Sequence, residues 1–227
     1  MKHNHLMHWA IAFAVMVLAV FVAYQFLDRP IAFYSSEHFV KKPWFDGLTQ
    51  IPEYLWRVAV GVFALGGIYG LIGRPLPHCL AVALASSVSL VAGSAIKDSL
   101  KFAFGRTWPE TWVQNNPSLI RDGAYGFNIF HGGQGFASFP SGHTTATCAV
   151  MAVLWFCYPS FRALYVMVIA AVVIGLIGAD YHFLGDIIAG GFLGWLVGWV
   201  VVQLWHVGER RAPQAEAEPS GGASPPR

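Results

Sequence analysis

The chain has 227 residues, of which 56% are hydrophobic and only 11% are charged, and its mean hydropathy is +0.51. Because soluble domains carry about a quarter charged residues, this composition excludes an ordinary soluble domain and indicates a membrane protein. The formal net charge of +2 gives no indication of nucleic-acid binding, and we expect no nucleic-acid partner. The expected surroundings are therefore a lipid bilayer.

Six apolar stretches follow one another along the chain, each close to the length that crosses a hydrocarbon core as a helix. The first has no small-residue cleavage site before Asp28-Arg29, which favours a membrane span over a signal peptide. The predicted fold is all-α, a bundle of six transmembrane helices. The predicted spans are residues 9–27, 55–73, 78–96, 144–158, 163–179 and 187–205.

Two of these spans carry small residues at intervals of four, which allows helices to approach closely in lipid. These residues are Ala81, Ala85, Ser89 and Gly93 in the third span and Gly190, Gly194 and Gly198 in the sixth. We expect residues 1–211 to form one membrane domain. Residues 212–227 are rich in Pro, Ala, Glu, Gly and Ser and are expected to be a disordered tail.

Polar residues that are scattered in sequence are brought together by this topology. The end of the third span, the start of the fourth and the turn between the fifth and sixth lie at one membrane face. Ionisable groups at membrane depth are functional candidates, because burying them is costly. The residues that converge are Lys97, Lys101, Arg106, Ser141, His143, His182 and Asp186.

Residues 139–145 read Phe-Pro-Ser-Gly-His-Thr-Thr and lead from a glycine-rich loop into an apolar stretch. This pattern predicts the entry of a helix. A helix N-terminus presents unpaired N–H groups and partial positive charge, which suit a phosphate. The alternative interpretation is an ordinary helix cap with a histidine nearby.

His182 and Asp186 are four residues apart, so on a helix they face the same way. A carboxylate bonded to one imidazole nitrogen leaves the other nitrogen free to act as a nucleophile. His143 can then protonate a leaving oxygen, while cationic side chains and backbone amides hold a phosphoryl group. This pattern predicts phosphoryl transfer through a phosphohistidine. A structural His–Asp pair at a helix start is the alternative.

A metal site is a further use of these residue types, since His143, His182, Asp180 and Asp186 are possible ligands. The neighbouring cationic cluster would repel a metal ion, and no spacing typical of a metal site is present. We therefore expect neither a metal nor another cofactor.

Pro140-Ser141-Gly142-His143, followed by His182 and Asp186 and preceded by a Lys and Arg cluster, resembles the type 2 phosphatidic acid phosphatase family. These integral-membrane lipid phosphatases are related to soluble acid phosphatases and vanadium haloperoxidases. The resemblance covers about residues 50–206 and includes the order of motifs and spans.

The resemblance implies a role for each matched residue. His182 is the implied nucleophile, His143 the general acid and Asp186 the residue that orients His182. Ser141 and Gly142 are the implied phosphate-binding residues, and the reaction is implied to need no metal.

The first motif of the family, K-x-x-x-x-x-x-R-P, is matched in part. Lys101 and Pro109 stand at the expected spacing, but Trp108 occupies the arginine position. Arg106, two residues earlier, is in position to supply a guanidinium, and the missing positive charge is expected to come from Arg106, Arg121 or Lys97. We therefore expect Lys97, Lys101 and Arg106 to bind the substrate phosphate.

The third motif also departs from the family pattern, because Gly175 and Leu176 stand where the family has Ser-Arg. Three functions remain open. The first is a phosphatase acting on a lipid phosphate such as undecaprenyl diphosphate, lipid A, phosphatidylglycerol phosphate or phosphatidate. The second is a lipid phosphotransferase that uses the same site. The third is a degenerate lipid-binding membrane protein.

Positive charge in short segments predicts the orientation in the membrane. The face opposite the site carries Lys2, Arg74, Arg162, Arg210 and Arg211, so this face is expected to be cytoplasmic. The protein is then a multi-pass (inner) membrane protein with both termini in the cytoplasm. Its active site would face outward, toward the periplasm in a Gram-negative cell.

Overall fold

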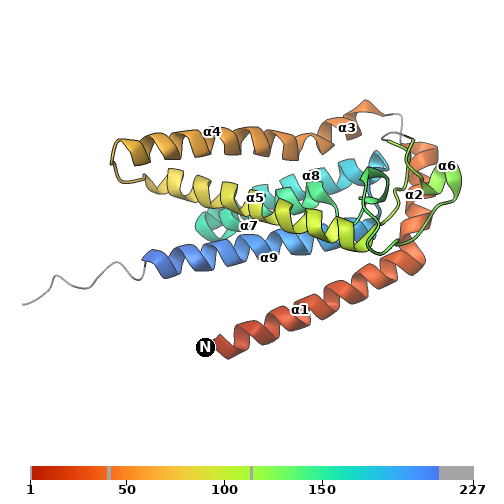
Figure 1. The fold of residues 1–227 in the computed structure, drawn as a ribbon, viewed down its shortest axis with the longest axis horizontal. Coiled ribbons are helices and arrows are strands. Elements are labelled where there is room, and N and C mark those ends of the chain that lie inside the picture. The colour runs from red at the N-terminus through yellow and green to blue at the C-terminus, as the bar shows by residue number, and fades with distance from the viewer. Residues whose placement is uncertain (1, 40–41, 113–114, 210–227) are drawn as a thin grey trace, which may run out of the picture.

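The computed structural model describes residues 2–39, 42–112 and 115–209, whose regular elements are all helices (Figure 1). The predicted all-α class is therefore confirmed, and the expected disordered tail lies outside the described residues. The helices are α1 (Lys2–Val22), α2 (Asp28–His38), α3 (Pro43–Thr49), α4 (Ile51–Leu71), α5 (His78–Phe104), α6 (Leu119–Asp122), α7 (Gly142–Cys157), α8 (Arg162–Gly178) and α9 (Leu184–Glu209).

Five helical stretches in the described part of the chain are long and apolar enough to cross a membrane. The apolar helix α7 is shorter than these and corresponds to the fourth predicted span. The stretches are Leu6–His38, Pro43–Leu71, His78–Phe104, Pro159–Gly178 and Leu184–Trp205. The described helices thus form a membrane-type bundle with five candidate spans, and the sixth expected span is the shorter helix α7.

Helix α5 extends beyond its predicted end at residue 96 and ends at Phe104. Charged side chains do not stop a helix, since they can reach toward water while the backbone stays helical. The helix ends instead at Gly105, which adopts φ +56° and donates its N–H to the Lys101 carbonyl. A Cβ at Gly105 would lie 1.9 Å from the Asn128 carbonyl oxygen, so the loop folds back directly on this glycine.

Helix α7 lies inside the bundle, with residues 144–153 buried. The two predicted stripes of small residues pack against it from two helices. On α9, a Cβ at Gly194 would lie 2.3 Å from the Thr145 carbonyl oxygen. On α5, the Ser89 hydroxyl donates to the Ala149 carbonyl at 3.0 Å. These close approaches confirm the packing role predicted for both stripes.

The N-terminal helix changes direction near the loop end of the bundle. A π-helical turn, Ala23–Leu27, separates α1 from α2, and such turns are a common cause of helix bends. Figure 1 shows α1 approaching the end of the bundle where the loops gather and α2 turning across that end. The turn places Asp28, the first residue of α2, in the interior, where its side chain is fully buried.

Candidate active site

The residues expected to form the site meet at the end of the bundle that holds the loop between α5 and α7. Five of them, Lys97, Lys101, Gly142, His143 and His182, border a partly open pocket of about 340 Å³. Its lining comes from α4, α5, α7, the loop and the turn before α9. The lining residues are Pro52, Glu53, Trp56, Ser94, Lys97, Asp98, Lys101, Trp108, Gly142, His143, Ala146 and His182.

His182 is held on one side by Asp186, in the first turn of α9. The His182 Nδ1 atom lies 3.5 Å from Asp186 Oδ2. The same carboxylate oxygen accepts from the Ser138 hydroxyl at 2.6 Å and from the Phe183 N–H at 3.1 Å. Because Nδ1 faces this fixed carboxylate, Nε2 is the nitrogen left for chemistry at the pocket.

His143 faces His182 from the second position of α7. The two ring centroids are 5.7 Å apart with an interplanar angle of 67°, and both side chains line the pocket. On its other side the His143 ring stacks with Tyr181, at 6.2 Å and 18°. Two imidazoles thus flank one small polar space, as a nucleophile and an acid acting on one group require.

Burial controls the protonation of His182. It lowers the pKa of His182 below the usual 6.5, while the bond to Asp186 acts in the opposite direction and Lys101 acts with burial. The imidazole is therefore neutral near pH 7, which is the form that can attack phosphorus.

Two lysines supply the positive charge that lines the pocket among the described residues. Lys97 lies against Gly142, where an added Cβ would be 3.1 Å from Lys97 Cδ, and its ammonium pairs with Asp98 at 2.6 Å. Lys101 donates to the Ala137 carbonyl and lies over the Trp108 ring, 5.4 Å from its centroid. Both predicted lysines therefore stand where a phosphate in the pocket would meet them.

Arg106 differs from its predicted position. Its guanidinium is fully buried, does not line the pocket, and binds Asp186 Oδ1 at 2.5 Å and Asp28 Oδ2 at 2.6 Å. Burial lowers the pKa of Arg106, but Asp186 and Asp28 outweigh it, so the net pKa shift is upward and the group stays charged. The expected phosphate contact is replaced by contacts that position Asp186.

Ser141 also takes part in the structure of the loop-to-helix entry. It is the N-cap of α7, with its hydroxyl accepting from the Thr144 N–H at 3.5 Å, and it is fully buried outside the pocket lining. Its own N–H donates to the Asp186 carbonyl at 3.0 Å. Ser141 thereby joins the start of α7 to the start of α9, while Gly142 borders the pocket itself.

The positions of the possible ligands test the alternative that the site binds a metal ion. Within residues 2–39, 42–112 and 115–209, no group of three His, Cys, Asp or Glu side chains is placed to hold a metal ion. Asp180, one of the possible ligands, is buried, and burial raises the pKa of its carboxyl to about 8. It is therefore mostly protonated at pH 7 and poorly suited to bind a cation.

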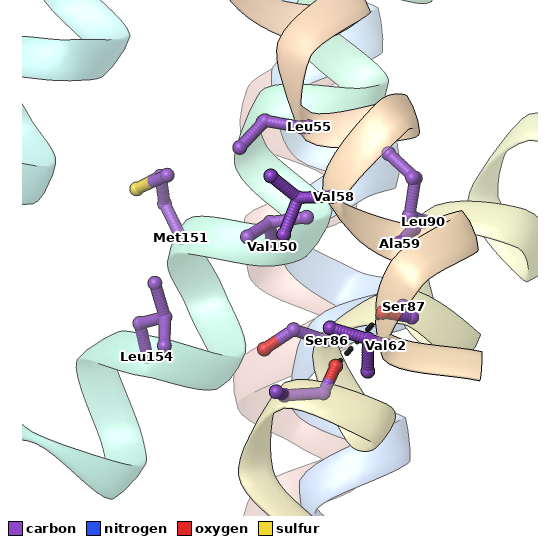
Figure 2. A pocket seen from close by; sticks show the side chains of 11 residues that line it. Leu55, Val58, Ala59, Val62, Ser86, Ser87, Leu90, Val150, Met151 and Leu154 are labelled. Atoms are coloured by element: carbon purple, nitrogen blue, oxygen red, sulfur yellow. Dashed lines mark hydrogen bonds between the residues drawn. The ribbon is translucent and has the colours of Figure 1, made fainter. Parts of the chain in front are cut away.

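An apolar cavity of about 200 Å³ lies along the same helices as the polar pocket (Figure 2). Helices α4, α5 and α7 line both spaces, and neighbouring turns contribute to each. On α4, Trp56 borders the pocket and Ala59 borders the cavity. On α5, Ser94 borders the pocket and Leu90 borders the cavity. The polar pocket is thus followed, deeper in the bundle, by a space lined mainly by aliphatic side chains.

Comparison with known proteins shows the family of the chain. The sequence model of the PAP2 superfamily matches residues 74–209, more than half of the chain. This chain belongs to the PAP2 superfamily. It is 25% identical over 202 residues to a lipid A 1-phosphatase of Rhizobium etli, covering 83% of this chain and 82% of that protein. A PAP2-type phosphatidylglycerolphosphate phosphatase from Bacillus subtilis has a similar fold, with a TM-score of 0.54 and 17% identity, covering 92% of this chain and 98% of that structure.

Two positions distinguish this PAP2 chain from the pattern expected from the resemblance. Trp108 lines the pocket with its ring centroid 5.1 Å from that of His182, and its Nε1–H donates to the Gln134 carbonyl at 2.7 Å. Leu176 is fully buried with Val172 and Ile187. Neither position offers a cation, and Arg121, which the sequence suggested as a substitute, is exposed and paired with Asp122.

Sequence reasoning missed two residues that hold Asp186. Ser138 bonds it directly, and Asp28 reaches it through Arg106. In the sequence, Asp28 marks only the end of the first predicted span. A lone carboxylate beside an apolar stretch was the available signal, since such groups need a partner when buried.

Proposed function

We propose that this protein is a membrane phosphatase that hydrolyses the phosphate ester or diphosphate of a lipid through a phosphohistidine at His182. The observation that carries the proposal is the pair of imidazoles facing each other across one pocket, with Asp186 fixing His182 from behind. The relatives are named as phosphatases of lipid A and of phosphatidylglycerolphosphate, which supports the same class of substrate.

In the first step, His182 Nε2 forms a bond to phosphorus as the bond from phosphorus to the lipid oxygen breaks. His143, in its protonated form, gives a proton to that oxygen, which leaves as the lipid alcohol from a phosphate ester or as the lipid monophosphate from a diphosphate. Water then attacks the phosphohistidine, and His143 accepts the proton that the water loses. Phosphate leaves and His182 is neutral again. Lys97, Lys101 and the amide of Gly142 offset the charge on the phosphoryl oxygens.

The two adjacent spaces support a lipid substrate over a small soluble ester. A phosphate in the polar pocket would leave its hydrocarbon chain beside the cavity of Figure 2. The cavity is lined mainly by aliphatic side chains, which match the hydrocarbon chain of a lipid, whereas a small soluble ester has no chain to place there. The cavity lies within the helices that span the bilayer, so the chain can enter from the membrane.

The test is phosphate release by the purified protein in detergent micelles containing EDTA. The panel contains undecaprenyl diphosphate, lipid A, phosphatidylglycerol phosphate and phosphatidate. We expect release by the wild type and by His131→Ala, whose histidine is exposed in the loop, and no release by His182→Ala. The best substrate then identifies the class. Release that disappears with EDTA, or that survives in His182→Ala, would contradict the mechanism, and phosphate transfer to an added lipid alcohol would identify a transferase.

The proposed orientation places the site outside the cytoplasm, because Arg74 and Arg162 lie at the opposite ends of their helices from the site. Cysteine labelling tests this in intact cells. In a Cys148→Ala/Cys157→Ala background, the exposed native Cys79 is expected to resist a membrane-impermeant maleimide. A cysteine introduced by Cys79→Ala/His131→Cys is expected to react. The opposite pattern would reverse the orientation.

A further inference from the structure

A buried row of charged groups connects the N-terminal helix to the catalytic carboxylate. Arg106 Nη2 lies 2.6 Å from Asp28 Oδ2, and Arg106 Nη1 lies 2.5 Å from Asp186 Oδ1. All three side chains are fully buried. The rings of Tyr24, Phe127 and Phe183 surround the guanidinium, with centroids 4.4–5.3 Å from its central carbon. Arg106 therefore has a fixed position between two carboxylates.

Asp28 touches the site region at a second point. Its Oδ1 accepts the N–H of Gly185, the residue before Asp186, at 2.9 Å. The fit is close, because a Cβ on Gly185 would lie 3.2 Å from Asp28 Oδ2 and 3.3 Å from Arg106 Nη1. One carboxylate thus holds both the arginine that binds Asp186 and the backbone that carries Asp186.

The charges of this row determine how strongly Asp186 acts on His182. Asp186 alone with Arg106 would form a neutral pair, and its carboxylate would attract a proton on His182 only weakly. With Asp28 the three groups carry one net negative charge. The arginine is shared between two carboxylates, which leaves part of the Asp186 charge to act on the imidazole.

We propose that Asp28 is a positioning residue for the nucleophile, acting through Arg106 and the Gly185 amide to set the place and the effective charge of Asp186. The inference rests on the proposed function, in which His182 attacks phosphorus. It assigns a role to α2, which lies outside the part of the chain that matches the superfamily model.

Other titratable groups near His182 set the background for a test by pH. They come from each element that borders the pocket and are unchanged in the variants below, so a shift in pH dependence reports on the buried row. These groups are Glu53 on α4, Lys97, Asp98 and Lys101 on α5, His143 on α7 and Asp186 on α9.

The first test is Asp28→Asn, which keeps the size of the side chain and an oxygen for the Gly185 amide. We expect kcat to fall by about 10–100-fold, as for other residues that orient a catalytic group. The full charge of Arg106 then acts on Asp186, which weakens its hold on a protonated His182. The acid limb of the kcat profile is therefore expected to move to lower pH by about 0.5 unit or more.

Two readouts separate positioning from a purely structural role. KM is expected to stay within about twofold, because Asp28 does not border the pocket. Ser35→Ala changes another buried polar residue, two turns along the same helix, and is expected to leave the acid limb in place. If Asp28→Asn lowers only the amount of active protein and leaves the acid limb at the wild-type pH, the inference is wrong.

A second pair of variants covers the case in which Arg106 without Asp28 prevents folding. Arg106→Gln and Asp28→Asn/Arg106→Gln both lack the buried cation, so neither depends on Asp186 alone to compensate it. The double variant is expected to show its acid limb at lower pH than Arg106→Gln, since it lacks the charge of Asp28. If the acid limbs of the two variants lie at the same pH, the inference is overturned.

Failure of the proposed function would be visible separately, as a wild type that releases no phosphate. In that case the readout is the rate at which diethylpyrocarbonate modifies His182, measured as a function of pH. Mass spectrometry of the peptide that contains His182 gives this rate. A lower midpoint in Asp28→Asn than in the wild type supports the inference. An unchanged midpoint overturns it, whatever the enzyme's activity.

Discussion

The two sides of His182 differ in how their charges are arranged. Behind the ring, Asp186 is buried and bonded to Arg106, Ser138 and the Phe183 amide. In front of the ring, the cations bordering the described pocket are Lys97 and Lys101, and Trp108 stands where the resemblance places an arginine. The nucleophile is thus held by a rigid polar network, while the phosphate meets flexible point charges.

This difference suggests a division of roles between the two sides. An arginine gives two parallel bonds to phosphate, whereas a lysine gives a compact charge on a flexible stem. We therefore expect the catalytic histidine to be well oriented and the phosphate to be bound less tightly than by a pair of arginines.

The largest effect is expected for Leu176→Arg, which restores a residue of the family pattern. In this chain the position is fully buried with Val172 and Ile187, so the new charge would have no partner and too little space. An uncompensated buried charge costs about 3–5 kcal/mol, and we expect loss of folded protein, measured by thermal unfolding in detergent. Leu176→Met conserves volume and should be tolerated. A stable and more active Leu176→Arg would show that the pocket reaches this helix.

Loss of a single lysine tests the front of the site. Lys101→Ala should lower kcat/KM by about 10²–10³-fold, as for removal of one positioned donor. Lys97→Ala should cost less, because Asp98 already offsets part of the Lys97 charge at 2.6 Å. Steady-state kinetics on the best lipid measure both. An equal or larger loss for Lys97→Ala would show that Lys97 is the main phosphate ligand.

Trp108→Arg is expected to have a smaller effect and in the favourable direction. The ring lies 5.1 Å from that of His182 and borders the pocket, so a guanidinium there can reach a bound phosphate. One added charge-assisted bond of ~1.5 kcal/mol corresponds to about a tenfold lower KM. Trp108→Gln removes the ring without adding charge and should not improve KM. If both variants improve KM equally, removal of the ring is the cause.

The smallest effect is expected in the pH dependence of kcat/KM of the wild-type enzyme, compared with an enzyme whose histidine is exposed. Burial lowers the pKa of His182 below 6.5, so the neutral, reactive imidazole persists to lower pH than for an exposed histidine. The acid limb of the kcat/KM profile of the free enzyme is therefore expected below pH 6.5. A limb above this value would mean that Asp186 outweighs burial.

Much of the architecture could be predicted from the sequence, because hydropathy and the small-residue stripes of α5 and α9 are strong local signals. The grouping of Lys97, Lys101, His143 and His182 followed from topology alone. The roles of Arg106 and Ser141 could not be read in this way. Each depends on contacts from distant segments, such as Asp28 reaching Arg106 across 78 positions, and no local pattern encodes them.

The most direct test of the account is to trap the phosphorylated enzyme. The protein is mixed with a lipid substrate carrying ³²P in the phosphate, denatured within milliseconds in alkali, and digested for mass spectrometry. The account predicts an acid-labile, alkali-stable label on the His182 peptide in the wild type, and no label in His182→Ala. Rapid phosphate release by the wild type with no label at His182, or a label at His143, would contradict it.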